Sequence, residues 1–215
     1  MDSINDQLRA AARDGDEAEV RAFLLNPTCD TLSKDEWGRT ALMLAAYGGH
    51  ASCVNLLLPA SDPLIKNRSG FTALMLAASH GREMCLRLLL PVSDALAKNG
   101  EGWTALILAA LRGNASCVQL LLPVSDPLAK DNNGWNALMF AAHRGHDSCV
   151  RLLLPVSDIL AKNDREKTAS HLASQRGYTQ LAMLVDGYAL AQSEKLALDS
   201  VIPAGPPQKS CSLRM

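Results

Sequence analysis

Four of the six cysteines recur at one position of a repeating pattern, where their thiols could bind a metal or form disulfides. They are spaced every 32 residues, at Cys53, Cys85, Cys117 and Cys149. If the repeating units stack side by side, equivalent positions lie about 8–10 Å apart. A disulfide needs Cα atoms within about 7 Å, and zinc thiolates lie about 2.3 Å from one ion. The spacing therefore predicts four buried, free thiols, while Cys29 and Cys211 have no partner in the pattern.

The histidines and aspartates also fall at turn positions. His50 and His146 each follow a glycine, which favours a structural hydrogen bond over catalysis. His143 lies three residues before His146, but the turn at Gly145 separates them, so a metal site is not expected. A recurring aspartate occupies one turn position per unit, at Asp62, Asp94, Asp126 and Asp158. The nucleophile elbow, the phosphate-binding loop, the H-E-x-x-H motif and the dinucleotide fingerprint are absent from the sequence, which predicts no catalytic centre, metal or cofactor.

A regular repeat determines the elements that position these residues. A capping residue recurs every 32 residues, at Thr40, Thr72, Thr104, Asn136 and Thr168. Each can accept a hydrogen bond from a helix N-terminal amide, and an apolar, alanine-rich helix follows it. A glycine suited to a left-handed turn comes next, then a second helix that runs into Leu-Leu-Leu-Pro. Proline disfavours α geometry at the residue before it, so we expect the second helix to end there. One such unit cannot bury its apolar faces alone, but stacked units can.

The motifs of these units resemble the ankyrin repeat. The matching residues are "TALMLAA", "TALILAA" and "NALMFAA", the Gly49–His50 and Gly145–His146 pairs, and "CVNLLL"-type second helices. The resemblance covers roughly residues 5–187 and implies an all-α solenoid of stacked helix-turn-helix units with short extended loops. In the four full units the family's T-P-L-H start has Ala for Pro and Met or Ile for His, so its Thr–His hydrogen bond is expected only at His171. The exit "LLLPVSD" is one residue shorter than in the family, which accounts for the 32-residue period.

The repeat also divides the chain. The first segment has polar outer positions, as a terminal repeat requires: Gln7, Arg13, Asp14 and Glu17. The expected divisions are a degenerate N-terminal capping repeat (1–39), four full repeats (40–71, 72–103, 104–135 and 136–167), a C-terminal capping repeat (168–187), a possible extra helix (188–199) and a disordered tail (200–215).

Composition narrows the classes of partner. The formal net charge is −1, without a run of Lys or Arg, so we expect no nucleic acid. Apolar runs are too short to span a bilayer, which argues against membrane insertion. The amino end lacks the basic and apolar regions of a signal peptide, and free thiols favour a reducing compartment. We therefore expect a cytoplasmic monomer.

Large and charged side chains vary between the units where ankyrin repeats contact their partners, at the loop tips and the first helices. By the resemblance, the residue before each cap points from the loop tip toward solvent; this column is Arg39, Phe71, Trp103, Trp135 and Lys167. The second candidate set lies near the end of the first helices, at Tyr47, His80, Arg112 and Arg144. Tryptophan is enriched in binding hot spots, so these residues predict a protein-binding surface. The alternative is that the aromatic rings only pack on neighbouring loops.

The function expected from these features is a non-catalytic module or scaffold that binds another protein. Two alternatives remain from the sequence: a regulatory or inhibitory subunit of an enzyme, and an effector delivered into another cell. A third, an enzyme in its own right, is opposed by the missing nucleophile–base and metal patterns.

Overall fold

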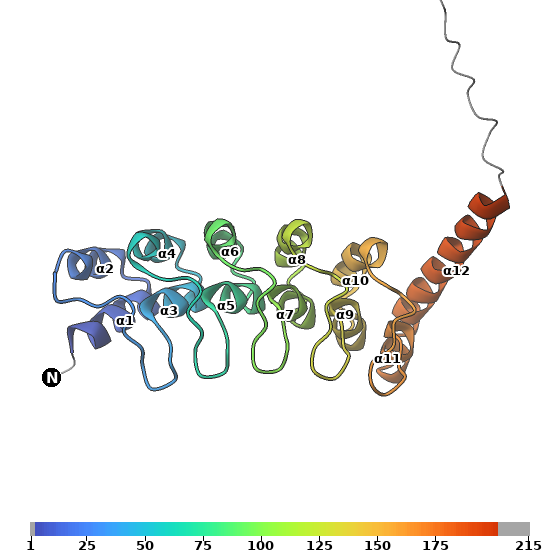
Figure 1. The fold of residues 1–215 in the computed structure, drawn as a ribbon, viewed down its shortest axis with the longest axis horizontal. Coiled ribbons are helices and arrows are strands. Elements are labelled where there is room, and N and C mark those ends of the chain that lie inside the picture. Colours follow the sequence, from blue (N-terminus) through green and yellow to red (C-terminus); the bar gives the residue numbers. More distant parts are fainter. Residues whose placement is uncertain (1–2, 202–215) are drawn as a thin grey trace, which may run out of the picture.

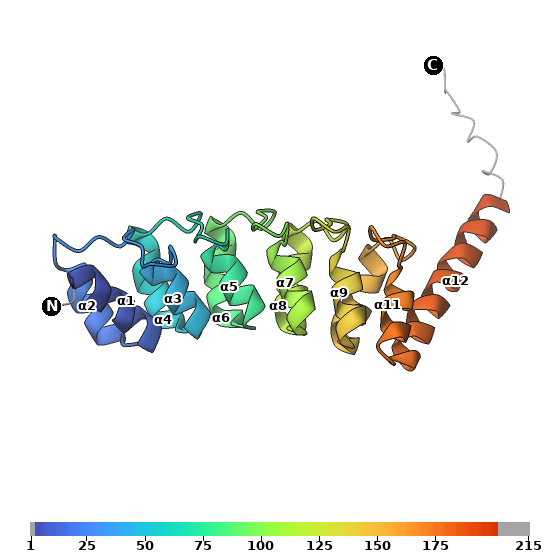
Figure 2. The same ribbon diagram turned by 90° about the horizontal axis from the view of Figure 1, so that it is seen from below.

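The computed structural model describes residues 3–201, and the regular elements in that range are all helical (Figure 1). The first helices of the pairs are α1 (Ile4–Asp14), α3 (Ala41–Gly48), α5 (Ala73–Ser79), α7 (Ala105–Arg112), α9 (Ala137–Arg144) and α11 (Ala169–Gln175). The second helices are α2 (Glu17–Leu24), α4 (Ala51–Leu57), α6 (Glu83–Leu89), α8 (Ala115–Leu121), α10 (Asp147–Leu153) and α12 (Thr179–Val201). The helix pairs stack in chain order, and the loops project together from one side of the array (Figure 2). The predicted all-α solenoid is confirmed.

Each first helix begins and ends as its sequence predicts. The capping side chain accepts a hydrogen bond from the backbone amide three residues later, as from Ile107 to Thr104 at 3.3 Å and from Met139 to Asn136 at 2.9 Å. The glycine after the helix has a positive φ, 76° at Gly113, which only glycine adopts without strain. The one Thr–His hydrogen bond expected from the family pattern is present, between Thr168 Oγ1 and His171 Nδ1 at 2.7 Å.

The core is one continuous cluster that runs from Leu8 to Val185. The alanines of the first helices, such as Ala45 and Ala109, are fully buried. A small side chain lets the backbones of neighbouring first helices approach closely, and alanine favours the helix as well. The core therefore extends across all the stacked pairs, and no single pair could bury it alone.

The end of each second helix differs from the expectation. The leucine before each proline keeps α geometry, for example φ −52° and ψ −45° at Leu58, so the proposed steric cause is wrong. The α-helical ladder ends because the nitrogen of Pro59 has no hydrogen to donate. The chain continues through one 3₁₀ turn, Leu58–Ala60, and becomes extended at Ser61. The same turn recurs at Leu90–Val92, Leu122–Val124 and Leu154–Val156.

The last helix, α12, is longer than predicted. The segment 188–199, expected as a possible extra helix, is the continuation of α12 from Thr179 to Val201. Its first turns pack on the core through Leu181, Ala182 and Val185. The predicted tail begins at residue 200, which α12 still includes, and residues 202–215 lie outside the described residues.

Candidate functional site

The loops between helix pairs are hairpins closed by an Asn or Asp side chain. The side-chain oxygen of Asn99 accepts hydrogen bonds from the backbone amides of Glu101 at 3.0 Å and Trp103 at 2.9 Å. The backbone of Asn99 also donates to the Trp103 carbonyl at 3.0 Å. The same bonding pattern recurs at Asp35, Asn67, Asp131 and Asn163. Each hairpin thus fixes the backbone of the residue that precedes the next cap.

Neighbouring hairpins are tied to one another. The backbone amide of Gly100 donates to the carbonyl of Ser69 at 3.2 Å, and equivalent bonds join the other successive tips. The ammonium groups of Lys66 and Lys98 each donate to the carbonyl of the next lysine in the column, at 2.8 Å. A Cβ on Gly70 would lie 2.8 Å from the Gly100 nitrogen, so this close approach requires glycine. The tips therefore form one connected surface.

Together, the hairpins and the adjoining side of the first helices form a surface that we call the loop face. The hairpins that contribute to it span residues 35–39, 67–71, 99–103, 131–135 and 163–167. All nine residues predicted to bind a partner lie on these hairpins or on α3, α5, α7 and α9 or their C-terminal ends.

The predicted aromatic column is half-buried, so the expectation that it points into solvent is wrong. Phe71, Trp103 and Trp135 all pack against the core. The indole nitrogen of Trp103 donates to Asp131 Oδ2 at 3.1 Å. The rings of Trp103 and Trp135 both contact Phe140, with centroids 5.9 and 5.0 Å apart. Packing is therefore part of what these side chains do, as the alternative interpretation expected.

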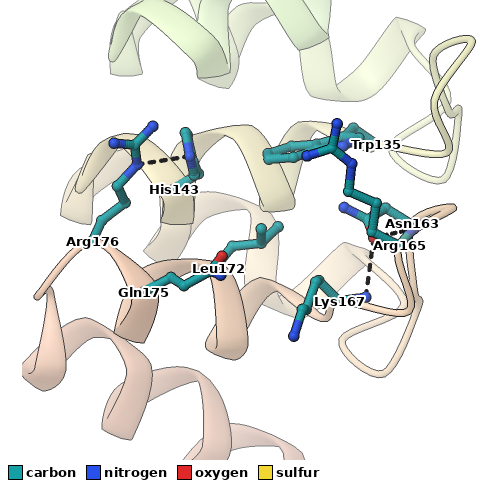
Figure 3. A pocket seen from close by; sticks show the side chains of 8 residues that line it. All are labelled: Trp135, His143, Asn163, Arg165, Lys167, Leu172, Gln175 and Arg176. Carbon is teal, nitrogen blue, oxygen red and sulfur yellow. Dashed lines mark hydrogen bonds between the residues drawn. The ribbon is translucent and has the colours of Figure 1, made fainter.

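Two hollows of the same construction lie on the loop face. The C-terminal hollow, of about 370 Å³, lies between the last two hairpins and helices α9 and α11 (Figure 3). Its lining residues are Trp135, His143, Asn163, Arg165, Lys167, Leu172, Gln175 and Arg176. The N-terminal hollow, of about 250 Å³, lies two repeats earlier. Its lining residues are Asn67, Ser69, Phe71, Leu76, Ser79, His80, Trp103, Leu108, Leu111 and Arg112.

Phe140 contacts a lining residue of each hollow. In the other repeats its position is a leucine: Leu44, Leu76, Leu108 and Leu172. The larger ring of Phe140 contacts both Trp103 and Trp135. These three rings therefore form an aromatic cluster that joins a wall of the N-terminal hollow to a wall of the C-terminal hollow.

The structure brings most of the predicted residues together. Phe71, Trp103, His80 and Arg112 line the N-terminal hollow. Trp135 and Lys167 line the C-terminal hollow, and Arg144 is exposed at the end of α9.

The two remaining predicted residues lie nearer the amino end. The ring of Tyr47 contacts His80 with centroids 4.2 Å apart. Arg39 makes an ion pair with Asp35 at 2.7 Å and lies over Trp37, 4.4 Å from the ring centroid. These two residues line neither hollow.

Sequence reasoning did not identify several further residues of this face. They include Trp37, Phe140, Arg165 and Arg176. The repeat register could have identified Arg176, because it lies 64 residues, or two repeats, after Arg112. Trp37, which is 56% exposed, could not be found from the register, because it lies two residues before the column position Arg39.

The C-terminal hollow is cationic. Arg165, Lys167 and Arg176 line it, and no carboxylate does. The guanidinium Nε of Arg176 donates to Nε2 of His143 at 2.8 Å. Burial, together with the charges of Arg176 and Arg144, lowers the pKa of His143 below its usual 6.5. His143 is therefore a neutral acceptor at neutral pH.

Cations on the second helices α6 and α10 differ from those of this hollow because they make ion pairs. On the second helices, Arg87 pairs with Glu83 at 2.8 Å and Arg151 pairs with Asp147 at 2.7 Å. Within residues 3–201, the cations on and beside the two hollows make no ion pair; these are Arg112, Arg144, Arg165, Lys167 and Arg176. The loop face thus carries a group of cations that are not held in ion pairs within the described residues.

The recurring cysteines are buried, and the two histidines that follow turn glycines contact backbone carbonyls. Burial of the repeated cysteines is confirmed, and it raises the pKa of Cys85, Cys117 and Cys149 to about 11. Cys211 lies outside the described residues. His50 Nε2 lies 3.0 Å from the Arg13 carbonyl, and His146 Nε2 lies 3.2 Å from the Leu111 carbonyl, as predicted for structural hydrogen bonds.

Metal binding and membrane insertion find no support among the described residues. Among residues 3–201, no cluster of three His, Cys, Asp or Glu side chains could hold a metal ion. No helix in the same range has the length and apolar character needed to cross a membrane.

Comparisons with known proteins agree with this architecture. Among curated proteins, none matches the chain. A chain of one solved structure matches with a TM-score of 0.75 and 27% sequence identity, over 84% of this chain and 97% of its own length. That structure is the predatory endopeptidase Bd0816 from Bdellovibrio bacteriovorus in complex with the immunity protein Bd3460. A family model of ankyrin repeats in three copies matches residues 8–98 and 92–163, and this protein therefore belongs to the ankyrin repeat family.

Proposed function

We propose that this protein is a non-catalytic interaction module that binds another protein on its loop face. The observation that carries the proposal is the pair of hollows, each with predicted binding residues in its wall. The family is one of protein-interaction modules, and the similar solved structure is itself a complex of two proteins. Two hollows lined by equivalent repeat positions and separated along the array fit an extended segment of a partner.

The rigidity of the loop face supports the same proposal. Each hairpin is closed by its own Asn or Asp side chain, and successive tips are joined by backbone hydrogen bonds. A surface fixed before binding loses less conformational freedom when a partner docks. Half-buried tryptophans such as Trp103 and Trp135 can pack on the array and still present an edge to a partner.

Steric blocking of the two hollows tests this function. Leu111→Trp fills the N-terminal hollow, and Gln175→Trp fills the C-terminal hollow, without removing a charge. Ser116→Trp and Ser148→Trp are matched controls, because both serines are exposed on second helices. The partner is captured from an extract with the wild-type chain and identified by mass spectrometry. We expect the hollow-filling variants to lose that partner and the controls to retain it; equal capture by all four variants would place the binding site elsewhere.

A second candidate function is an inhibitory or immunity subunit of an enzyme. The observation that favours it is the matched complex of an endopeptidase with an immunity protein, at 27% identity over 97% of the matched chain. If this candidate is correct, the captured partner is an enzyme, and the purified chain lowers its activity in proportion to binding. A partner without enzymatic activity would exclude this candidate and leave the interaction module intact.

We also infer that the chain acts as a cytoplasmic monomer without enzymatic activity and does not bind nucleic acid. The net charge of −1 supplies no overall attraction for a polyanion. The alternative of an effector delivered into another cell differs only in location. Fractionation of the producing cells and their medium distinguishes these two.

A further inference from the structure

We propose that the C-terminal hollow is a carboxylate-binding subsite, and that the partner segment recognised by the loop face is an acidic peptide with an apolar residue a few positions away. This inference rests on the proposed function and specifies the chemistry of the partner. In Figure 3, Trp135, Arg165 and Lys167 lie on the hairpin side, and His143, Gln175 and Arg176 lie on the helix side, with Leu172 between them.

The three cations that line this hollow are not paired with a carboxylate in the described part of the chain. Arg144 adds a further positive charge next to His143, whose proton affinity it lowers. Like charges that share a hollow repel one another, so an anion in the hollow is favoured by all of them at once. Arginine also matches the planar geometry of a carboxylate with two parallel hydrogen bonds.

His143 keeps one of these cations in place. Its Nε2 accepts a hydrogen bond from Nε of Arg176, which leaves the two terminal nitrogens of that guanidinium free to donate to a ligand. The edge of Trp135 contacts the His143 ring with centroids 5.2 Å apart. Arg176 is therefore held by a neutral acceptor and keeps its full charge for the anion.

The N-terminal hollow takes a different side chain. Only one cation, Arg112, lines it, and the other walls include Phe71, Trp103 and Leu108. This hollow suits an aliphatic or aromatic side chain. The two hollows are two repeats apart, about 16–20 Å at the spacing of packed helices, which an extended peptide spans with about five or six residues. An acidic residue and an apolar residue at that separation could occupy both hollows together.

An acidic protein segment fits these features better than a nucleic acid. The lysines that recur along the array, Lys66, Lys98 and Lys130, each donate to a backbone carbonyl of the next repeat, whereas three cations cluster at the C-terminal hollow. The chain also has no net positive charge. A polyanion would gain from a longer track of cations. The loop face instead combines aromatic side chains, such as Trp103 and Trp135, with cationic side chains, which matches a segment with both apolar and acidic residues.

Peptide binding to the full chain tests the proposal. The probe is a fluorescein-labelled peptide on a Gly/Ser background, with two glutamates at one end and a tryptophan six residues away. Fluorescence anisotropy measures its binding, and a second peptide has glutamine in place of both glutamates. We expect the glutamate peptide to bind at least tenfold more tightly, with an affinity that falls as salt rises. Equal binding of the two peptides, or no binding of either, would overturn the proposal.

Variants of the hollow provide the matched comparison. Arg165→Gln together with Lys167→Gln should weaken the glutamate peptide at least tenfold and leave the glutamine peptide unchanged. Arg87→Gln together with Arg151→Gln removes two cations from the second helices and should change neither. Inorganic phosphate and a single-stranded oligonucleotide are the competitors. Displacement of the peptide by millimolar phosphate alone would assign the site to a free anion. Tighter binding of the oligonucleotide than of the peptide would assign the site to nucleic acid. Either outcome overturns the peptide proposal.

The natural partner separates this inference from the proposed function. If Gln175→Trp abolishes capture of that partner but Arg165→Gln with Lys167→Gln does not, the loop face is the binding site and the carboxylate subsite is wrong. If none of these variants affects capture, the proposed function itself fails.

Discussion

At the scale of single residues, the pKa of His143 reflects the burial and the positive charges at the C-terminal hollow. Its ring is half-buried and lies against Trp135, and its Nε2 accepts from Arg176. Burial disfavours the charged imidazolium, and the charges of Arg176 and Arg144 disfavour it further, so the pKa is lowered from 6.5. Because the unfolded chain takes up this proton more readily than the folded chain, the contribution of His143 to stability decreases as the pH falls below about 6.5.

We therefore predict that His143 titrates with a midpoint below 6.5, measured by NMR on the folded protein. Arg176→Gln removes one of the two nearby charges and should raise the midpoint, without restoring it fully, because burial remains. Arg87→Gln, far from the ring on α6, is the control and should leave the midpoint unchanged. A midpoint at or above 6.5 in the wild-type chain would contradict the described environment.

The repeated cysteines give a second prediction at this scale. Burial raises the pKa of Cys85, Cys117 and Cys149 from 9.0 to about 11, and the thiolate is the reactive form. These thiols should react with an aromatic disulfide reagent at pH 8 only after unfolding, when all six cysteines become available. The unfolded chain releases these protons at lower pH than the folded chain, so the free energy of unfolding should also fall as the pH rises from about 9 toward 11. Fewer than six reactive thiols in the unfolded, unreduced chain would reveal a disulfide.

At the scale of elements, the turn after each first helix depends on glycine for two reasons. Gly113 has φ 76°, and a Cβ at that position would lie 2.6 Å from Nδ1 of His146 in the next repeat. The equivalent glycines Gly49, Gly81 and Gly145 lie against Arg82, Asn114 and Tyr178. The residue after each glycine thus crosses to the preceding repeat and closes the end of its first helix.

Gly113→Val should lower the free energy of unfolding by about 1 kcal/mol or more, because a β-branched residue resists a positive φ and also collides with His146. The matched control is Gly187→Val in α12, where an added Cβ meets no atom within 4 Å. Valine has a higher helix propensity than glycine, so the control should leave stability unchanged or raise it by a few tenths of a kcal/mol. Chemical denaturation measures both variants, and equal stabilities would show that the turn assignment is wrong.

The elements differ in how well the sequence predicts them. The caps at Thr104 and Asn136 and the turn at Gly113 follow from local chemistry that repeats every 32 residues, so the helix pairs were predictable. The 3₁₀ turn through Pro59 was not predictable. The steric effect of proline favours an extended residue before it, whereas the missing N–H of proline ends the hydrogen-bond ladder and lets that residue stay helical. The choice between those geometries depends on how the turn packs.

The candidate site, too, could be predicted only in part from the sequence. The column that contains Trp103 and Trp135 was identified from its register, but its half-burial was not, because the rings pack on Phe140 of one repeat only. The hollows form between repeats, so no single unit contains one. The cation cluster at Arg165, Lys167 and Arg176 likewise joins a hairpin to the end of the next first helix. A strict repeat predicts what the units share, and the site is built from what they do not share.

At the scale of the whole molecule, the array separates a structural side from a variable side. The second helices carry paired charges such as Glu83–Arg87, and the stacked first helices bury the alanines of the core. The loop face carries aromatic side chains and cations such as Arg112 and Arg176 that make no ion pair within the described residues. Because the helix pairs form one continuous core, the two hollows keep a fixed separation, and that separation determines which partner segment can fill both.

Site-specific crosslinking to the captured partner tests this account most directly. A photo-activatable side chain is placed at Gln175 or Leu111 on the loop face, and at Ser148 on α10 as the control. The account predicts crosslinks to one partner from 175 and 111, at partner positions about five or six residues apart when the bound segment is extended, and none from 148. Crosslinks from 148 with none from 175 or 111 would place the partner on the second helices and contradict the central claim that the loop face binds it.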